Sequence, residues 1–308
     1  MATEGSRHVR VREVGLRDGL QSISQTMPTA AKLAWIDAEF EAGVREMEVC
    51  SFVPARLMPQ FVDAAEVVGH ALCIPGLTVA ALVPNARGAQ TALELGVHKL
   101  NYVTSASESH NRANVRRTRE ESLEGFREVA RLAAGTGTIL VGGISTAFGC
   151  TIEGTVPHEQ VLQLARSYVE AGAREIVLGD TVGFANPVAI RELVEKVHAA
   201  VGSVPIALHL HDTRGLGLAN VAAGLEVGVR DFDAALAGMG GCPHAPGASG
   251  NIVSEDLVFL LESMQWTTGI DVQKLLQVRA ILQEELPGIS LLGAMAKAGL
   301  PLGFKEAR

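Results

Sequence analysis

The sequence is poor in aromatic residues and cysteines, and it has no long apolar run. Aromatic residues make up 4% of the 308 residues, and the four cysteines, at positions 50, 73, 150 and 242, form no CxxC pair. This excludes a disulfide-stapled scaffold and a cysteine-rich zinc domain. No run of about 18 apolar residues exists to span a membrane. The first residues, MATEGSRHVRVREVG, lack the apolar core of a signal peptide, so we expect a reducing, cytoplasmic setting.

Positive charge is also in deficit. The chain has 26 Lys and Arg against 34 Asp and Glu, and the resulting formal charge of −8 argues against nucleic acid as the main partner. Hydrophobic residues are plentiful at 47%, while 33 Gly and 12 Pro follow no strict period. This composition excludes a disordered or a collagen-like chain. A chain of this length buries about three quarters of the surface it exposes when unfolded, so an aliphatic core needs no disulfides.

Apolar runs that end in polar residues or glycine alternate with segments of helical spacing. Several of these segments stop at a glycine just before the next run, as helices commonly do. The predicted strands are Val11–Asp18, Glu46–Phe52, Leu77–Val83, Lys99–Ser105, Thr138–Phe148, Glu175–Gly183, Pro205–Thr213 and Asp231–Gly240. The predicted helices between them are Ala30–Ala42, Gln60–Val68, Ala86–Leu95, Arg119–Ala134, His158–Ala171, Pro187–Ala200 and Ala219–Gly228.

Eight strand and helix units in about 240 residues are typical of a (β/α)8 TIM barrel. The alternative is a doubly wound open sheet, but GLRDGLQ after the first strand lacks the GxGxxG spacing of its phosphate-binding turn. Beyond residue 252 the pattern predicts helices over Ser254–Met264, Val272–Leu286 and Leu291–Ala298. No linker marks a second domain. We therefore expect one domain over residues 1–308, with a barrel at about 9–262 and a C-terminal helical extension at about 263–308.

Polar residues gather where the predicted strands end, which is the functional face of such a barrel. His209 and His211 are two apart on one strand, so both side chains point to one face. By itself the pair also fits two hydrogen-bonded core histidines. Asp18, on the first strand, and Asn251, after the eighth, add oxygen donors that barrel closure brings near the seventh strand. Two imidazoles with a carboxylate and an amide oxygen suit an octahedral Mg²⁺ or Mn²⁺.

Three further charged residues stand at strand ends. Arg17 is either an ion-pair partner of Asp18 or a permanent positive charge that stabilises an enolate oxygen. The two are adjacent, so both face the site only if the strand has broken there. Glu48 and Asp180 are either structural carboxylates or proton-transfer groups, because a carboxylate in a partly apolar barrel mouth has a raised pKa.

The segment Gly238–Asn251 surrounds Cys242 with five glycines and two prolines. A loop of small residues can close over a ligand and deliver a thiol, although an ordinary surface turn has the same composition. The other cysteines are predicted to be small buried hydrophobes, and Cys150 also stands where it could line the site.

An arginine-rich segment, SHNRANVRRTREES, follows the fourth predicted strand. Its arginines are Arg112, Arg116, Arg117 and Arg119. Such a run usually forms a solvated helix face. The alternative is an anion site for a phosphorylated ligand.

The strings EVGLRDGLQ, MEVCSFV, LGDTVG, HLHDT, AGMGGCPHAPGASGN and SEDLVFLLE together resemble the 3-hydroxy-3-methylglutaryl-CoA lyases, a family of metal-dependent barrel lyases. The resemblance spans about residues 13–262. It implies that a divalent cation is held by Asp18, His209, His211 and Asn251. It also implies that Arg17 stabilises the enolate, that Cys242 is the catalytic loop cysteine, that Glu48 and Asp180 are active-site carboxylates, and that three further positions lie near the substrate: Gln21, Ser51 and Cys150.

The same strings separate this chain from related condensing enzymes. Synthases typically read RDGEQ and HxHND, whereas this chain has Leu20 and Thr213 at the distinguishing positions. It departs from typical lyases at Leu16, in the arginine-rich segment and in AFGCTIEG. The substrate-lining residues therefore vary more than the catalytic ones.

The expected reaction is metal-assisted retro-Claisen cleavage of 3-hydroxy-3-methylglutaryl-CoA to acetoacetate and acetyl-CoA, a step of leucine degradation. The alternatives are a related hydroxyacyl-CoA such as citramalyl-CoA, a longer branched homologue, a condensing acyltransferase, or a non-catalytic acyl-CoA-binding protein. The expected partners are an acyl-CoA substrate and a second copy of the chain in a homodimer, with neither nucleic acid nor membrane.

Overall fold

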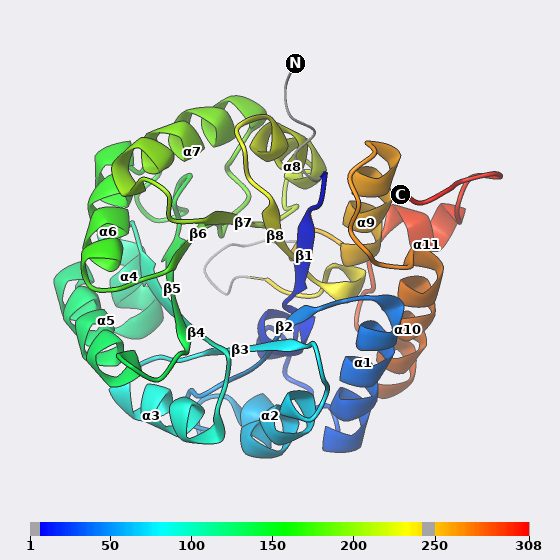
Figure 1. Ribbon diagram of the computed structural model, residues 1–308, viewed down its shortest axis with the longest axis horizontal. Helices are drawn as coiled ribbons and strands as arrows, with labels where there is room; N and C mark the ends of the chain where they lie inside the picture. The colour runs from blue at the N-terminus through cyan, green and yellow to red at the C-terminus, as the bar shows by residue number, and fades with distance from the viewer. Residues whose placement is uncertain (1–6, 242–249, 308) are drawn as a thin grey trace.

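A computed structural model describes residues 7–241 and 250–307 of the chain. Eight parallel strands close into a barrel in chain order, and β1 pairs with β8 to complete the circle (Figure 1). The TIM barrel predicted from the sequence is confirmed. The strands are β1 (Arg10–Glu13), β2 (Glu46–Ser51), β3 (Thr78–Leu82), β4 (Lys99–Ser105), β5 (Ile139–Ser145), β6 (Glu175–Asp180), β7 (Ile206–Leu210) and β8 (Asp231–Ala234).

Helices surround the barrel and connect successive strands (Figure 1). The α-helices are α1 (Thr29–Ala42), α2 (Ala64–Leu72), α3 (Ala86–Leu95), α4 (Glu108–Val115), α5 (Arg119–Ala133), α6 (His158–Glu170), α7 (Pro187–Val201), α8 (Gly217–Glu226), α9 (Ser254–Ser263), α10 (Val272–Glu285) and α11 (Ala294–Ala298). Three short helical turns are η1 (Gly15–Gly19), η2 (Pro59–Phe61) and η3 (Leu236–Gly238). After the barrel, α10 packs against α1 and α11 packs against α9. Among the described helices, none is long and apolar enough to cross a membrane.

The structure corrects the sequence-based boundaries at several strand ends. β1 ends at Glu13, and Arg17 and Asp18 lie on the helical turn η1 rather than on the strand. β8 ends at Ala234 instead of Gly240. Helix α4 is not among the helices predicted from apolar periodicity, because its sequence ESHNRANV is largely polar and carries no apolar period. Only the arginine run suggested a solvated helix face in this segment. The N-cap of α4 is Ser107, whose hydroxyl accepts a hydrogen bond from the backbone N–H of His110.

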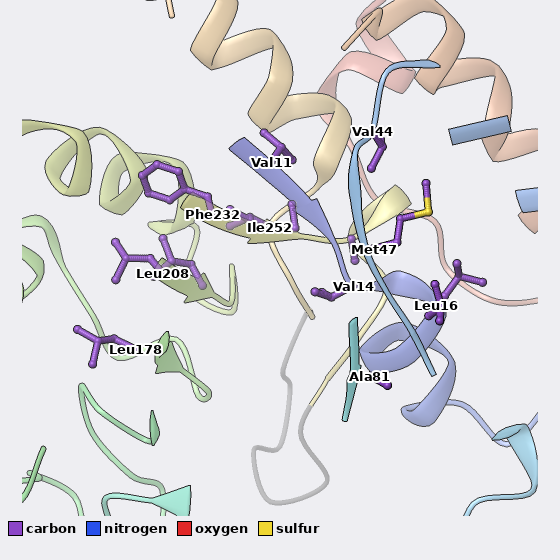
Figure 2. Close-up of a cluster of buried hydrophobic side chains, with 14 of the residues drawn as sticks. Val11, Val14, Leu16, Val44, Met47, Ala81, Leu178, Leu208, Phe232 and Ile252 are labelled. Atoms are coloured by element: carbon purple, nitrogen blue, oxygen red, sulfur yellow. The ribbon is translucent and has the colours of Figure 1, made fainter. Parts of the chain in front are cut away.

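The aliphatic core lies mainly between the strands and the helices. Figure 2 shows Val11, Leu178, Leu208 and Phe232 projecting from β1, β6, β7 and β8, and all four side chains are buried. Leu16 of η1 joins this cluster and is 1% exposed. Its burial anchors the helical turn to the core, so the two charged residues that follow it are held in a fixed place.

The inside of the barrel is charged rather than aliphatic. Arg12, Glu46, Lys99 and Glu175 are each 3–5% exposed and come from β1, β2, β4 and β6. The Nζ atom of Lys99 donates to Glu46 Oε1 at 2.6 Å and to Glu175 Oε2 at 2.8 Å. Buried charges persist only when they are paired, and these residues form a connected network.

Candidate active site

The helical turn η1 places Arg17 and Asp18 at the carboxyl ends of the strands. The backbone N–H of Gly15 donates to Glu13 Oε1 at 2.7 Å, and the N–H of Asp18 donates to the carbonyl of Val14 at 2.7 Å. A regular strand would point two adjacent side chains to opposite faces. The turn removes that constraint, so both charged side chains lie on the same side and contact each other.

A group of metal-ligand type forms where η1 meets β7. Asp18, His209 and His211 each offer one atom, and these atoms lie within 4.8 Å of one another. The two Nε2 atoms of His209 and His211 are 3.1 Å apart, and each lies 3.9–4.0 Å from Asp18 Oδ2. Ligands at about 2.1 Å from an octahedral cation are roughly 3 Å apart when they are neighbours and roughly 4.2 Å apart when they are opposite. The two imidazoles have the spacing of neighbouring ligands, and the distances to Asp18 lie between the two values.

Asn251 lies beside this group, because its backbone forms an isolated antiparallel β-bridge with His211. Its Nδ2 atom donates to Asp18 Oδ2 at 2.6 Å and to the carbonyl of Met239 at 2.9 Å. Its Oδ1 atom is buried and has no hydrogen-bond partner among the described residues. A buried oxygen without a partner is costly, and coordination of a cation would satisfy it. The donor set therefore fits a hard divalent cation, and the sequence correctly predicted that these four residues come together.

The electrostatics of the group keep Asp18 charged and His211 neutral, which are the forms in which these two side chains bind a cation. Burial and the charge of His209 lower the pKa of His211 to about 4, which leaves its imidazole neutral as a ligand must be. Burial lowers the pKa of His209, but its hydrogen bond to Asp233 and the charge of Asp18 outweigh that effect and raise it. Burial opposes ionisation of Asp18, yet the charge of Arg17 and the two histidines hold its pKa below the usual value.

Arg17 lies between two carboxylates. Its Nη1 atom donates to Asp18 Oδ1 at 2.6 Å, and its Nε atom donates to Glu48 Oε2 at 2.5 Å. Glu48 also accepts a hydrogen bond from Asn101 at 2.8 Å. Arg17 therefore forms the ion pair with Asp18 that was one of its two interpretations from the sequence. This ion pair also fixes the guanidinium beside the candidate cation site, so the two interpretations are compatible.

Asp180, at the end of β6, binds the backbone that follows it. Its oxygens accept hydrogen bonds from the N–H groups of Phe184 and Ala185 at 2.8–3.2 Å. Burial raises the pKa of Asp180 to about 6, in spite of those hydrogen bonds. The side chain therefore shapes the β6–α7 turn and also has a pKa suited to proton transfer.

The predicted substrate-lining residues differ in their exposure. Gln21 is partly exposed, and its Nε2 atom donates to Asp18 Oδ1 at 3.3 Å. Ser51 and Cys150 are fully buried, and the thiol of Cys150 accepts a hydrogen bond from the backbone N–H of Ile152. Cys242, predicted to be the loop nucleophile or acid, lies outside the described residues.

The cysteine predictions need one correction. Cys50 is buried as expected, but Cys73 is exposed because it caps the C-terminus of α2 at the surface.

The arginine-rich segment forms α4 and the start of α5. Arg112 and Arg119 both pair with Glu108, at 2.8 Å and 3.5 Å. Arg116 is exposed and ends α4 with a positive φ of 58°. The charge of this segment is therefore partly neutralised within the chain, which favours the solvated-face interpretation over a dedicated anion site.

Two residues near the group were missed by the sequence analysis. Asp233 of β8 faces His209, and Arg12 of β1 faces Asp233. Both belong to strands in which charged and apolar residues alternate, over Arg10–Arg12 in RVRE and throughout DFDA. Charged residues that recur on one face of a buried strand are the sequence signal for such a network. Only the barrel register shows that the charged positions of different strands face each other.

A closed (β/α)8 barrel that gathers two histidines, a carboxylate and an amide at its carboxyl end has a candidate metal site of the kind found in metal-dependent barrel enzymes. Residues 8–282 match the HMGL-like family, and the chain belongs to that family.

Named relatives agree with this assignment. The chain is 40% identical over 280 residues to the hydroxymethylglutaryl-CoA lyase YngG of Bacillus subtilis, covering 91% of this chain and 94% of the relative. It is 37% identical over 300 residues to the hydroxymethylglutaryl-CoA lyase of Pseudomonas mevalonii, covering 97% and 98% of the two chains. A solved HMG-CoA lyase from Acinetobacter baumannii, in complex with coenzyme A and 3-methylmalate, superposes with a TM-score of 0.92 at 40% identity, covering 99% and 100% of the two chains.

Proposed function

We propose that this protein cleaves 3-hydroxy-3-methylglutaryl-CoA to acetoacetate and acetyl-CoA. The observation that carries the proposal is the group of Asp18, His209 and His211 beside the Arg17 guanidinium, in a chain of the HMGL-like family. This combination supplies a cation site and a fixed positive charge at the same point of the barrel mouth.

The side chains of the site divide the roles of the proposed reaction among them. Asp18, His209, His211 and Asn251 hold the cation, which supplies Lewis-acid chemistry that lowers the pKa of the substrate hydroxyl. A site carboxylate, either Glu48 or Asp180, takes the hydroxyl proton as the bond between C2 and C3 breaks.

The electron pair of the broken bond passes to the acetyl-CoA fragment, where Arg17 stabilises the enolate oxygen. A site acid then protonates C2. Cys242 of the glycine-rich loop is our candidate for that acid, and Gln21, Ser51 and Cys150 are candidates for contacts around the acyl group.

The decisive experiment is an assay of both products with purified protein and Mg²⁺ or Mn²⁺. We expect acetyl-CoA and acetoacetate in equal amounts, and we expect a chelator to suppress them. His209→Ala should abolish turnover, whereas His198→Ala, on the outer helix α7, should leave it unchanged. Turnover that survives both chelation and His209→Ala would overturn the metal assignment.

The same assay distinguishes among acyl groups. One relative at 40% identity is a 3-hydroxy-3-isohexenylglutaryl-CoA and hydroxymethylglutaryl-CoA lyase of Pseudomonas aeruginosa. A longer branched hydroxyacyl-CoA is therefore the second candidate substrate, and citramalyl-CoA, which would yield pyruvate, completes the panel. The ratio of kcat/KM values among the three identifies the preferred acyl group.

We also propose the finer assignments. The oxygen-containing donor set favours Mg²⁺ or Mn²⁺ over zinc. The free cysteines fit a cytoplasmic enzyme of leucine degradation. The homodimer remains our proposal for the assembly, and sedimentation of the purified chain tests it directly.

A further inference from the structure

Asp233 links the candidate cation site to the charged interior of the barrel. It lies on β8, where the register sets it beside His209 of β7 on one side and Arg12 of β1 on the other. Its Oδ2 atom is 3.1 Å from His209 Nδ1, and its Oδ1 atom accepts a hydrogen bond from Arg12 Nε at 2.6 Å. Both carboxylate oxygens are therefore engaged, and the side chain is only 10% exposed.

This contact bears on the proton of the imidazole. A neutral histidine carries its proton on one ring nitrogen, and the partner of that nitrogen decides which one. A carboxylate can only accept, so His209 donates from Nδ1 to Asp233. The proton is then absent from Nε2, the atom that lies 3.1 Å from His211 Nε2 and 4.0 Å from Asp18 Oδ2.

Arg12 holds Asp233 from inside the barrel. The Nη2 atom of Arg12 lies 2.5 Å from Asp233 Oδ1, and its Nη1 atom pairs with Glu175. Lys99 in turn bonds Glu175 and Glu46 at 2.8 Å and 2.6 Å. Four other strands, β1, β2, β4 and β6, thus contribute buried side chains to the network that fixes the orientation of the Asp233 carboxylate.

We propose that Asp233, oriented by Arg12, is a positioning residue that keeps the proton of His209 on Nδ1 and aims Nε2 at the cation. The inference rests on the proposed function, because it assumes that His209 is a ligand. Carboxylates that hold a ligating imidazole in this way typically contribute about 10–100-fold to metal affinity. The charged barrel interior then serves the site as well as the fold.

The substitution Asp233→Asn tests this directly. Arg12 can only donate, so it keeps the amide oxygen on its own side and leaves the NH₂ group facing His209 Nδ1. That nitrogen must then accept, and the proton moves to Nε2, where it blocks coordination. We expect the Mn²⁺ affinity of the variant, measured by electron paramagnetic resonance of free Mn²⁺, to fall about 10–100-fold. Excess Mn²⁺ should partly restore kcat.

Asp231→Asn is the matched control. Asp231 lies two residues earlier on β8 and accepts from Arg10 Nε at 2.5 Å, and its cross-strand neighbours are Arg10 and Ala207. The substitution Asp231→Asn removes the same charge from the same strand, and we expect it to leave the Mn²⁺ affinity unchanged. Equal Mn²⁺ affinity for Asp233→Asn and the wild type would overturn the inference, as would an equal loss in both variants.

A measurement on the wild type avoids any folding defect of the variant. In the Mg²⁺-bound protein, ¹⁵N chemical shifts of the His209 ring should report a proton on Nδ1, with His209→Gln identifying the signal. A proton on Nε2 would overturn the inference. If the wild-type protein binds no Mn²⁺, the proposed function itself is contradicted. If the wild type and Asp233→Asn bind Mn²⁺ and cleave the substrate equally well, only the role of Asp233 is contradicted.

Discussion

At the scale of single residues, the site depends on charges that neutralise one another. Arg17 bonds both Asp18 and Glu48, and Asp18 in turn faces two histidines. All of these side chains are largely buried, so each one changes the ionisation of the next. A substitution here alters chemistry more specifically than it alters packing.

Arg17→Gln tests the electrostatic role. The substitution removes a permanent charge beside the position of the developing enolate, so we expect kcat to fall by about 10²–10³-fold. Steady-state kinetics with saturating Mn²⁺ measures this, on protein that circular dichroism shows to be folded. Arg17→Lys keeps the positive charge but cannot reproduce the paired hydrogen bonds of the guanidinium, so we expect its kcat to lie between those of the wild type and Arg17→Gln. A kcat within threefold of the wild type in Arg17→Gln would remove the guanidinium from the mechanism.

At the scale of elements, short segments that follow the strands place Asp18 and Asn251. The turn η1 follows β1, and the backbone around Gly240 passes close to Asn251. Gly240 has a φ of +137°, and a Cβ atom there would lie 2.3 Å from Asn251 Nδ2 and 3.0 Å from Asp18 Oδ2. The glycine is required for this close approach as well as for its backbone conformation.

Gly240→Ala should therefore damage the site through Asn251. We expect Mn²⁺ affinity to fall by about tenfold or more, the lower end of the range for altered support of a ligand. Gly228→Ala is the control, because Gly228 has a φ of +93° and open space within 4 Å of its Cβ position. Both variants should lose thermal stability from the positive φ, and Gly240→Ala should lose more because its Cβ atom meets Asn251. Only Gly240→Ala should lose Mn²⁺ affinity, as calorimetric titration can show. Retained affinity in Gly240→Ala would contradict this.

At the scale of the whole molecule, the fold contains buried carboxylates whose pKa values are raised. Burial raises the pKa of Glu13 to about 7. Burial and the charge of Glu13 raise the pKa of Glu39, on α1, well above its usual value. Both groups bind protons more tightly in the folded chain than in the unfolded chain. Their stabilising contribution is thus complete below the unfolded pKa of about 4.3 and is lost as pH rises through the folded value.

Glu39→Gln should flatten this pH dependence. The neutral amide does not titrate, so we expect the variant to gain thermal stability relative to the wild type at pH 8, with a smaller gain at pH 5. Thermal midpoints at the two pH values measure the difference. Glu41→Gln, an exposed position on the same helix, removes the same charge and should leave the pH dependence unchanged. Identical pH profiles for wild type and Glu39→Gln would contradict the prediction.

The sequence by itself determined the order of strands and helices, because apolar period and glycine stops are local signals. It also predicted that Asp18, His209, His211 and Asn251 lie close together, because alternation along a strand puts both histidines on one face and barrel closure brings the first and eighth strands beside the seventh. Only the tertiary structure decided that Arg17 and Asp18 share a side, because a helical turn replaces the end of β1. It alone showed that Arg12 contacts Asp233 and that Asp233 contacts His209. The first of these contacts joins residues more than two hundred positions apart, and it follows from the barrel register, which no local pattern encodes.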